Sequence, residues 1–174
     1  MELEIDPRAG RLSAAQKAQF DRDGFIKNLP VFAPDGVAQL QGMFDEWSGR
    51  LPEEIDINRV NMWHKASQSF ARLCHTPAIL DYVEDIIGPN FFQWGGQFFV
   101  KYPHDGSEVP WHQDSEYWPL SPRRTVTAWL AIYDTDEDNA AMKVIRGSHL
   151  KGGFKHHINN AANLVLSKEV DEYQ

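Results

Sequence analysis

The residues best suited to chemistry in this sequence are His112 and Asp114, within the stretch Trp111-His112-Gln113-Asp114. In an extended chain, side chains two residues apart point to the same face and lie roughly 6.5 Å apart. An imidazole nitrogen and a carboxylate oxygen can then converge on one metal ion. With a second histidine from elsewhere they would form a two-histidine, one-carboxylate triad, which leaves positions on Fe(II) open for a co-substrate and O₂.

The spacing alone does not separate a metal ligand from a surface histidine. A chain of 174 residues with 7 His and 25 Asp+Glu contains about one such spacing by chance. The surroundings favour a site, because Trp111, Tyr117 and Trp118 flank the pair and are typical of a pocket wall. The stretch also joins two strand-like segments, where a loop can present ligands.

The elements that must position this pair divide the chain in two. Residues 1–90 are expected to be mostly helical. Each of three predicted helices begins at an N-cap and ends at a glycine, and the pairs are Ser13 with Gly24, Asp35 with Gly49, and Thr76 with Gly88. The first helix has a capping box, since Gln16 follows Ser13 by three positions.

Residues 91–174 change to a strand-like pattern. Aromatic residues dominate 91–102, polar and apolar residues alternate along 125–133, and 142–145 is a short apolar run. The layout predicts an α+β fold or a β-sandwich with a helical N-terminal layer, in a single domain 1–174. Only about four strands can be counted, so the sheet is expected to be incomplete at its C-terminus.

Composition excludes several classes of partner. The formal net charge of -8 argues against nucleic acid and anionic membrane surfaces. No apolar stretch approaches the ~20 residues of a membrane helix, and the N-terminus lacks a signal-peptide pattern. The single cysteine, Cys74, forbids an internal disulfide. We therefore expect a cytoplasmic protein that acts on a small molecule, and the sequence leaves its oligomeric state open.

Six blocks together resemble the phytanoyl-CoA dioxygenase (PhyH) family of Fe(II)/2-oxoglutarate-dependent oxygenases. Their order and approximate spacing agree with the family from about residue 12 to about residue 155. The blocks are 21–25 (Asp-Arg-Asp-Gly-Phe), 88–90 (Gly-Pro-Asn), 111–114 (Trp-His-Gln-Asp), 117–120 (Tyr-Trp-Pro-Leu), 127–131 (Thr-Ala-Trp-Leu-Ala) and 147–149 (Gly-Ser-His).

The resemblance implies a double-stranded β-helix, the jelly-roll of cupin-like proteins, with 91–174 as its first part. It implies His112 and Asp114 as iron ligands, and Gln97, Trp129 and Arg59 as contacts of 2-oxoglutarate. Trp129 can equally be a core residue and Gln97 a polar residue at a sheet edge. The implied reaction is hydroxylation of a small organic substrate with O₂, because the carboxylate of Asp114 fills the position that halogenating relatives leave to chloride.

The sequence also departs from the family pattern. Family members place a third ligand, a histidine, and a 2-oxoglutarate-binding arginine well past the 147–149 block, where this chain has ended. No spacing favours His149, His156 or His157 as a replacement. The chain is thus expected to be either part of an ordinary oxygenase or a shortened, inactive cupin-like binding or interaction module. A zinc hydrolase would need a third ligand and a general base, and neither is visible.

Overall fold

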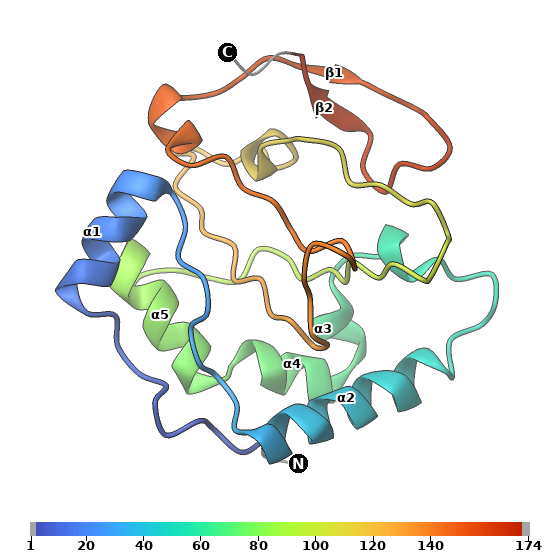
Figure 1. Ribbon diagram of the computed structural model, residues 1–174, viewed down its shortest axis with the longest axis horizontal. Helices are drawn as coiled ribbons and strands as arrows, with labels where there is room; N and C mark the ends of the chain where they lie inside the picture. Colours follow the sequence, from blue (N-terminus) through green and yellow to red (C-terminus); the bar gives the residue numbers. More distant parts are fainter. Residues whose placement is uncertain (1–2, 172–174) are drawn as a thin grey trace.

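The computed structural model describes residues 3–171 of the predicted domain 1–174, whose outermost residues lie outside that range (Figure 1). In this part of the chain all α-helices precede residue 88 and the only named strands follow residue 155. The helices are α1 (Ala14–Asp23), α2 (Pro34–Ser48), α3 (Trp63–Ala66), α4 (Gln68–Cys74) and α5 (Pro77–Ile87). Short 3₁₀ turns are Ile57–Arg59, Asp114–Glu116 and Ser148–Lys151, and the strands are β1 (His156–Ile158) and β2 (Lys168–Val170).

Local sequence signals set most of the helix ends. The capping box of α1 is confirmed, because Ser13 accepts from the backbone N–H of Gln16 and Gln16 reaches back to Ser13. Helix α5 begins after Thr76 and ends at Gly88, as predicted. The prediction that Asp35 caps α2 is wrong. That helix begins one residue earlier at Pro34, whose fixed φ and missing N–H suit a first helical position.

Helices α3 and α4 escaped prediction because they span only four and seven residues. Segments so short show too little of the 3.6-residue period to be recognised. Their residues Trp63 and Phe70 nevertheless belong to the main core.

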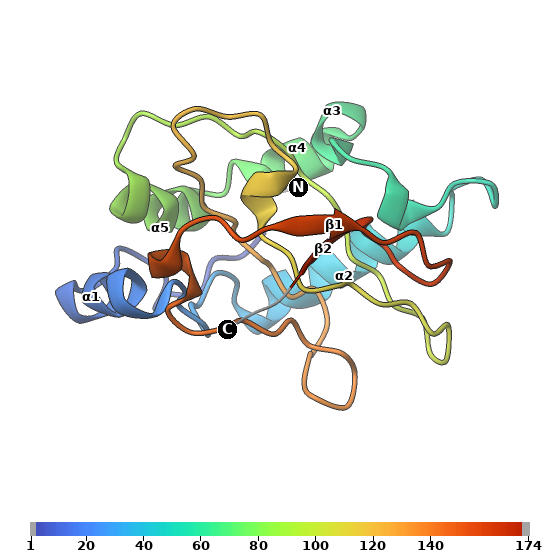
Figure 2. The same ribbon diagram turned by 90° about the horizontal axis from the view of Figure 1, so that it is seen from above.

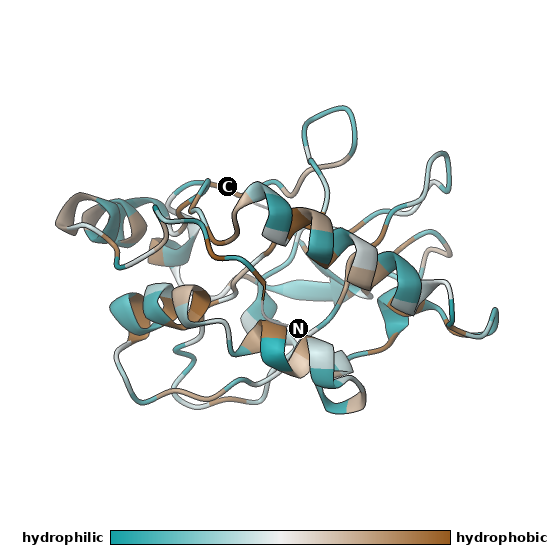
Figure 3. Ribbon diagram, turned by 90° about the horizontal axis from the view of Figure 1, so that it is seen from below, coloured by the Kyte–Doolittle hydropathy of each residue, from teal (hydrophilic) through white to brown (hydrophobic). Residues whose placement is uncertain are grey.

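Aromatic side chains hold the helical layer against the middle of the chain. The ring of Phe98 lies with its centroid 5.1 Å from Phe44 of α2 and 4.9 Å from Phe70 of α4. Trp47 of α2 meets Trp63 edge-on at 4.6 Å. Tilted and edge-on pairs of this kind are favoured over face-to-face stacking. The helices carry both hydrophobic and hydrophilic segments, which suits this one-sided packing (Figure 3).

The predicted strands 91–102, 125–133 and 142–145 do not form ladders within residues 3–171. The antiparallel pair β1–β2 is the sheet of this region, with His156 opposite Val170. The expected mainly-β layout is therefore not found there. The physical reason is that no neighbouring strand runs along the predicted segments, and an alternating pattern predicts a strand only where a partner supplies hydrogen bonds.

Amide side chains supply some of those missing hydrogen bonds. Asn58 donates to the carbonyl of Val100 at 2.8 Å and accepts from its N–H at 2.7 Å, as a neighbouring strand would. Gln41 of α2 donates to the carbonyl of Ile132 at 2.9 Å. These contacts satisfy backbone groups that would otherwise lack partners.

The end of α1 forms a clasp with the 147–149 block, which lies beside it in both views (Figures 1 and 2). The N–H of Gly147 donates to the carbonyl of Asp23 at 2.8 Å, and Nε2 of His149 donates to that of Asp21 at 3.0 Å. Gly24 has φ +84°, and a Cβ built on it would lie 2.4 Å from Nδ1 of His149. The imidazole thus occupies the space that any other residue at position 24 would need.

No helix within residues 3–171 combines the length and the apolar character needed to cross a membrane.

We expect Gly24→Ala to destabilise the fold by about 2 kcal/mol or more, because it adds a left-handed backbone penalty to a clash with His149. The matched control is Gly42→Ala in α2, where an added Cβ meets no atom within 4 Å. That change should stabilise by roughly 0.5–1 kcal/mol, as in an ordinary helix interior. Urea unfolding of both variants tests this, and equal shifts in their midpoints would contradict the clasp.

Candidate functional site

His112 and Asp114 face each other across the start of the 3₁₀ turn Asp114–Glu116. Nε2 of His112 lies 3.2 Å from Oδ1 of Asp114. On its far side, Nδ1 of His112 donates to the carbonyl of Pro110 at 2.7 Å. The other carboxylate oxygen of Asp114 accepts from the hydroxyl of Thr127 at 2.6 Å. A hydrogen bond on the far side of each side chain therefore fixes its orientation, so that Nε2 of His112 and Oδ1 of Asp114 face each other.

This pair of atoms fits two neighbouring positions on one metal ion. Atoms bound at about 2.1 Å and at a right angle lie about 3 Å apart. The observed 3.2 Å matches that separation. The Pro110 carbonyl fixes the proton on Nδ1, which leaves Nε2 free to act as a ligand, and such a contact is typical of metal-binding histidines. The donor set, one imidazole and one carboxylate, suits Fe(II).

The two groups stabilise each other's charge in the metal-free state. Burial opposes protonation of His112, yet its hydrogen bonds with Asp114 and the Pro110 carbonyl outweigh this and raise its pKa. The hydrogen bond with His112 lowers the pKa of Asp114, and the Thr127 hydroxyl adds to this against the effect of burial. The pair is thus an imidazolium and a carboxylate at mildly acidic pH.

The three predicted co-substrate residues lie on three other segments of the chain. Nε2 of Gln97 donates to the carbonyl of Asn58 at 2.6 Å, so Gln97 adjoins the turn that contains Arg59. Trp129 is 42% exposed and lies two residues beyond Thr127, the residue that contacts Asp114. Gln97 is thus hydrogen-bonded to the segment that contains Arg59. Trp129 lies on the same segment as Thr127, which donates to Asp114.

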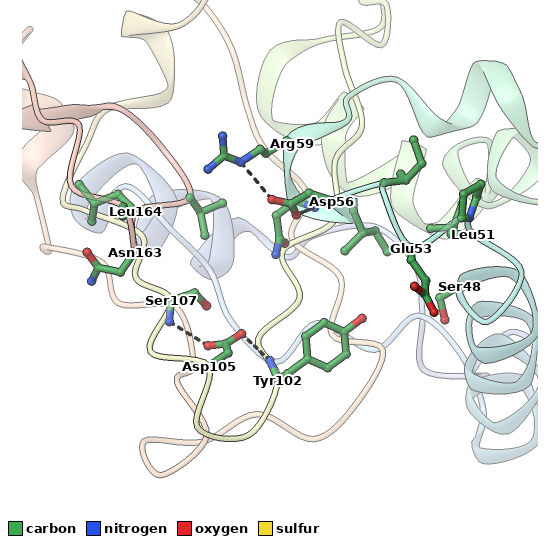
Figure 4. Close-up of a pocket in the computed structure, with 16 residues that line it drawn as sticks. Ser48, Leu51, Glu53, Asp56, Arg59, Tyr102, Asp105, Ser107, Asn163 and Leu164 are labelled. Carbon is green, nitrogen blue, oxygen red and sulfur yellow. Dashed lines mark hydrogen bonds and ion pairs between the residues drawn. The ribbon is translucent and has the colours of Figure 1, made fainter.

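Arg59 also lines a pocket of about 480 Å³, whose walls come from segments 48–59, 102–107 and 162–165 (Figure 4). The other four predicted site residues are not among its walls. Within the pocket, Nε of Arg59 donates to Asp56 at 3.0 Å. Asp105 accepts from the N–H groups of Tyr102 and Ser107. Much of the polar lining is therefore engaged in local contacts.

The three histidines considered as a third ligand are occupied elsewhere. His149 belongs to the clasp with α1. Nε2 of His156 accepts from the N–H of Gln113 at 3.0 Å, and Nδ1 of His157 lies 2.8 Å from Asp171. Among residues 3–171 no group of three His, Cys, Asp or Glu side chains is arranged to hold a metal ion.

Sequence reasoning did not identify Thr127 or His156 as parts of this site. Thr127 stands on the alternating stretch 125–133, opposite its aliphatic positions, which is a weak signal for a polar contact. His156 lies in a polar stretch whose pattern does not predict the β1–β2 hairpin. Only the folded chain brings either residue to the loop that contains His112.

The family model described as "Phytanoyl-CoA dioxygenase (PhyH)" matches residues 20–164, which is most of the chain and includes the His112–Asp114 pair. The chain belongs to the phytanoyl-CoA dioxygenase family. Membership agrees with the resemblance of the six sequence blocks. The jelly-roll is the fold of this family, and the described residues contain several helices and one two-stranded sheet.

Three relatives show the range of similarity to this chain. Peroxisomal phytanoyl-CoA dioxygenase of Bos taurus is 29% identical over 170 residues, which cover 84% of this chain and 50% of the bovine protein. Ectoine dioxygenase of Streptomyces coelicolor is 27% identical over 155 residues, covering 80% of this chain and 52% of that protein. L-Proline trans-4-hydroxylase of Streptomyces griseoviridis is 21% identical over 179 residues, covering 88% of this chain and 67% of that protein.

The chain spans about half the length of the phytanoyl-CoA and ectoine dioxygenases that it matches. No solved structure matches it significantly. These relatives are named as dioxygenases of phytanoyl-CoA and ectoine and as a hydroxylase of L-proline.

We expect the His112–Asp114 pair to stabilise the metal-free fold only within a pH window. The pKa of Asp114 is lowered, so its contribution is present above about pH 4 and is lost as pH falls through the lowered value. The pKa of His112 is raised, so its contribution is present below about pH 6.5 and is lost as pH rises through the raised value. Asp114→Asn should therefore lower Tm most near pH 5–6.

The effect should stay under about 1 kcal/mol, because 42% of the Asp114 side chain is exposed. Asp138→Asn, at an exposed loop position, makes the same charge change and is the control. Thermal unfolding from pH 3 to pH 9 measures both. A difference from wild type that is flat across this range for Asp114→Asn would contradict the pairing.

Proposed function

We propose that this chain is a non-haem Fe(II)/2-oxoglutarate-dependent oxygenase that hydroxylates a small organic substrate, with His112 and Asp114 as two protein ligands of the iron. The observation that supports it most is the 3.2 Å separation of His112 Nε2 and Asp114 Oδ1 inside a chain of the phytanoyl-CoA dioxygenase family. The relatives named for phytanoyl-CoA, ectoine and L-proline support a small molecule as substrate.

The chain's own residues would hold and orient the reacting groups. When bound, Fe(II) with 2-oxoglutarate supplies the activation of O₂ for hydroxylation. His112 would bind through Nε2, with its ring held by the Pro110 carbonyl. Asp114 would bind through Oδ1, and Thr127 would keep the carboxylate from turning away by its bond to Oδ2. Metal binding would displace the proton from Nε2 of His112, so affinity should rise with pH.

We further propose that Arg59, Gln97 and Trp129 contribute to the binding of 2-oxoglutarate. Arg59 offers a guanidinium, which pairs with carboxylates in a planar, two-point arrangement. Its position next to the Asn58 carbonyl that accepts from Gln97 puts the two side chains on adjoining segments. Trp129, partly exposed and two residues beyond Thr127 along the chain, offers an aromatic surface.

An anaerobic titration of the chain with Fe(II) and 2-oxoglutarate tests the proposal. We expect a weak visible charge-transfer band, because 2-oxoglutarate binds the iron directly in enzymes of this type. His112→Ala should abolish the band, since it removes one of the two donors. The control His104→Ala changes an exposed loop histidine and should leave the band unchanged. Absence of the band in the wild-type chain, or an equal band in His112→Ala, would refute the proposal.

A further inference from the structure

Gln113 stands between the two candidate ligands and is held by three hydrogen bonds from one short segment. Its backbone N–H donates to Nε2 of His156 at 3.0 Å. Its side-chain Nε2 donates to the carbonyl of Gly152 at 2.9 Å, and its Oε1 accepts from the N–H of Phe154 at 2.7 Å. Segment 152–156 therefore holds both the backbone and the side chain of this one residue.

The conformation of Gln113 gives these contacts a consequence for its neighbours. Its backbone is extended, with φ -111° and ψ 126°. In an extended chain, adjacent side chains point to opposite faces. Because segment 152–156 holds Gln113 on one face, His112 and Asp114 are turned toward the other, where their donor atoms meet.

The contact with His156 requires a particular form of its ring. Nε2 can accept from the N–H of Gln113 only if it bears no proton. Nδ1 lies 2.9 Å from the carbonyl of Phe154 and must then donate to it. His156 is therefore the neutral Nδ1–H tautomer, half-buried at the start of β1.

The second strand of the hairpin holds the two sides of the same loop. The N–H of Val170 donates to the carbonyl of Trp111 at 2.8 Å, before the pair. The N–H of Lys168 donates to the hydroxyl of Tyr117 at 2.8 Å, after it. Figures 1 and 2 show the turn Asp114–Glu116 beside both strands. The hairpin thus restrains the loop at its centre and at both ends.

We propose that His156 is a positioning residue: by accepting the N–H of Gln113 it sets the direction in which His112 and Asp114 present their donor atoms. The effect on metal binding rests on the proposed function, whereas the effect on the loop does not. The two can therefore be measured separately.

Amide hydrogen exchange of Gln113, followed by NMR in the metal-free chain, tests the effect on the loop. His156→Leu removes the acceptor and should speed this exchange at least about tenfold. His156→Gln offers a carbonyl oxygen in its place and should restore protection. His157→Leu is the matched control, because His157 is the next residue of β1 but pairs with Asp171. Unchanged exchange in His156→Leu, or an equal increase in His157→Leu, would overturn the proposal.

Binding of Mn(II), followed by electron paramagnetic resonance, tests the effect on the ligands. His156→Leu should weaken Mn(II) binding by roughly 10–100-fold, the usual effect of removing a residue that orients metal ligands, and His156→Gln should recover most of it. Cooperative thermal unfolding of each variant shows that it is folded. Equal Mn(II) affinity of His156→Leu and wild type would overturn the positioning role. Failure of the wild-type chain to bind Mn(II) would instead refute the proposed metal site, and the Gln113 exchange would still decide the contact.

Discussion

Backbone groups in the second half of this chain must find hydrogen-bond partners outside regular helices and sheets, and the rest of the structure depends on how they do so. An unpaired N–H or carbonyl away from water is costly, so each needs a substitute for the strand it lacks. Polar side chains supply several: Asn58 pairs with both backbone groups of Val100, and Tyr117 with both of Lys168. Irregular segments are thereby fixed to particular residues far away in the sequence.

The same constraint shapes the candidate site. His112 and Asp114 sit on a loop whose conformation comes from contacts on its outer side, with Pro110, Thr127 and segment 152–156. Their mutual attraction holds the two donor atoms together before any ion arrives. A site prepared in this way needs little rearrangement on binding, although the proton shared by the pair must leave.

Some of this arrangement could be predicted from the sequence and some could not. The capping box at Ser13 and the proline and glycine around α5 act within a few residues, so their positions follow from local chemistry. The His112–Asp114 contact is also local, since one residue separates them. The supports of the site are different, because Thr127 and His156 reach the loop through the fold. The predicted strand ladders are not found for a similar reason. The alternating pattern of 125–133 describes one segment and does not identify a partner strand.

The clasp between Gly24 and His149 has a consequence for how this sequence can change. The imidazole of His149 occupies the space in which a Cβ at position 24 would lie. The residue types tolerated at these two positions, distant in the chain, therefore depend on each other. A larger residue at position 24 would need a smaller residue at position 149 and would still carry the strain of φ +84°. A smaller residue at 149 alone would leave a void next to Gly24. In an alignment of many related sequences, substitutions at positions 24 and 149 should therefore occur together, because the two residues are in contact.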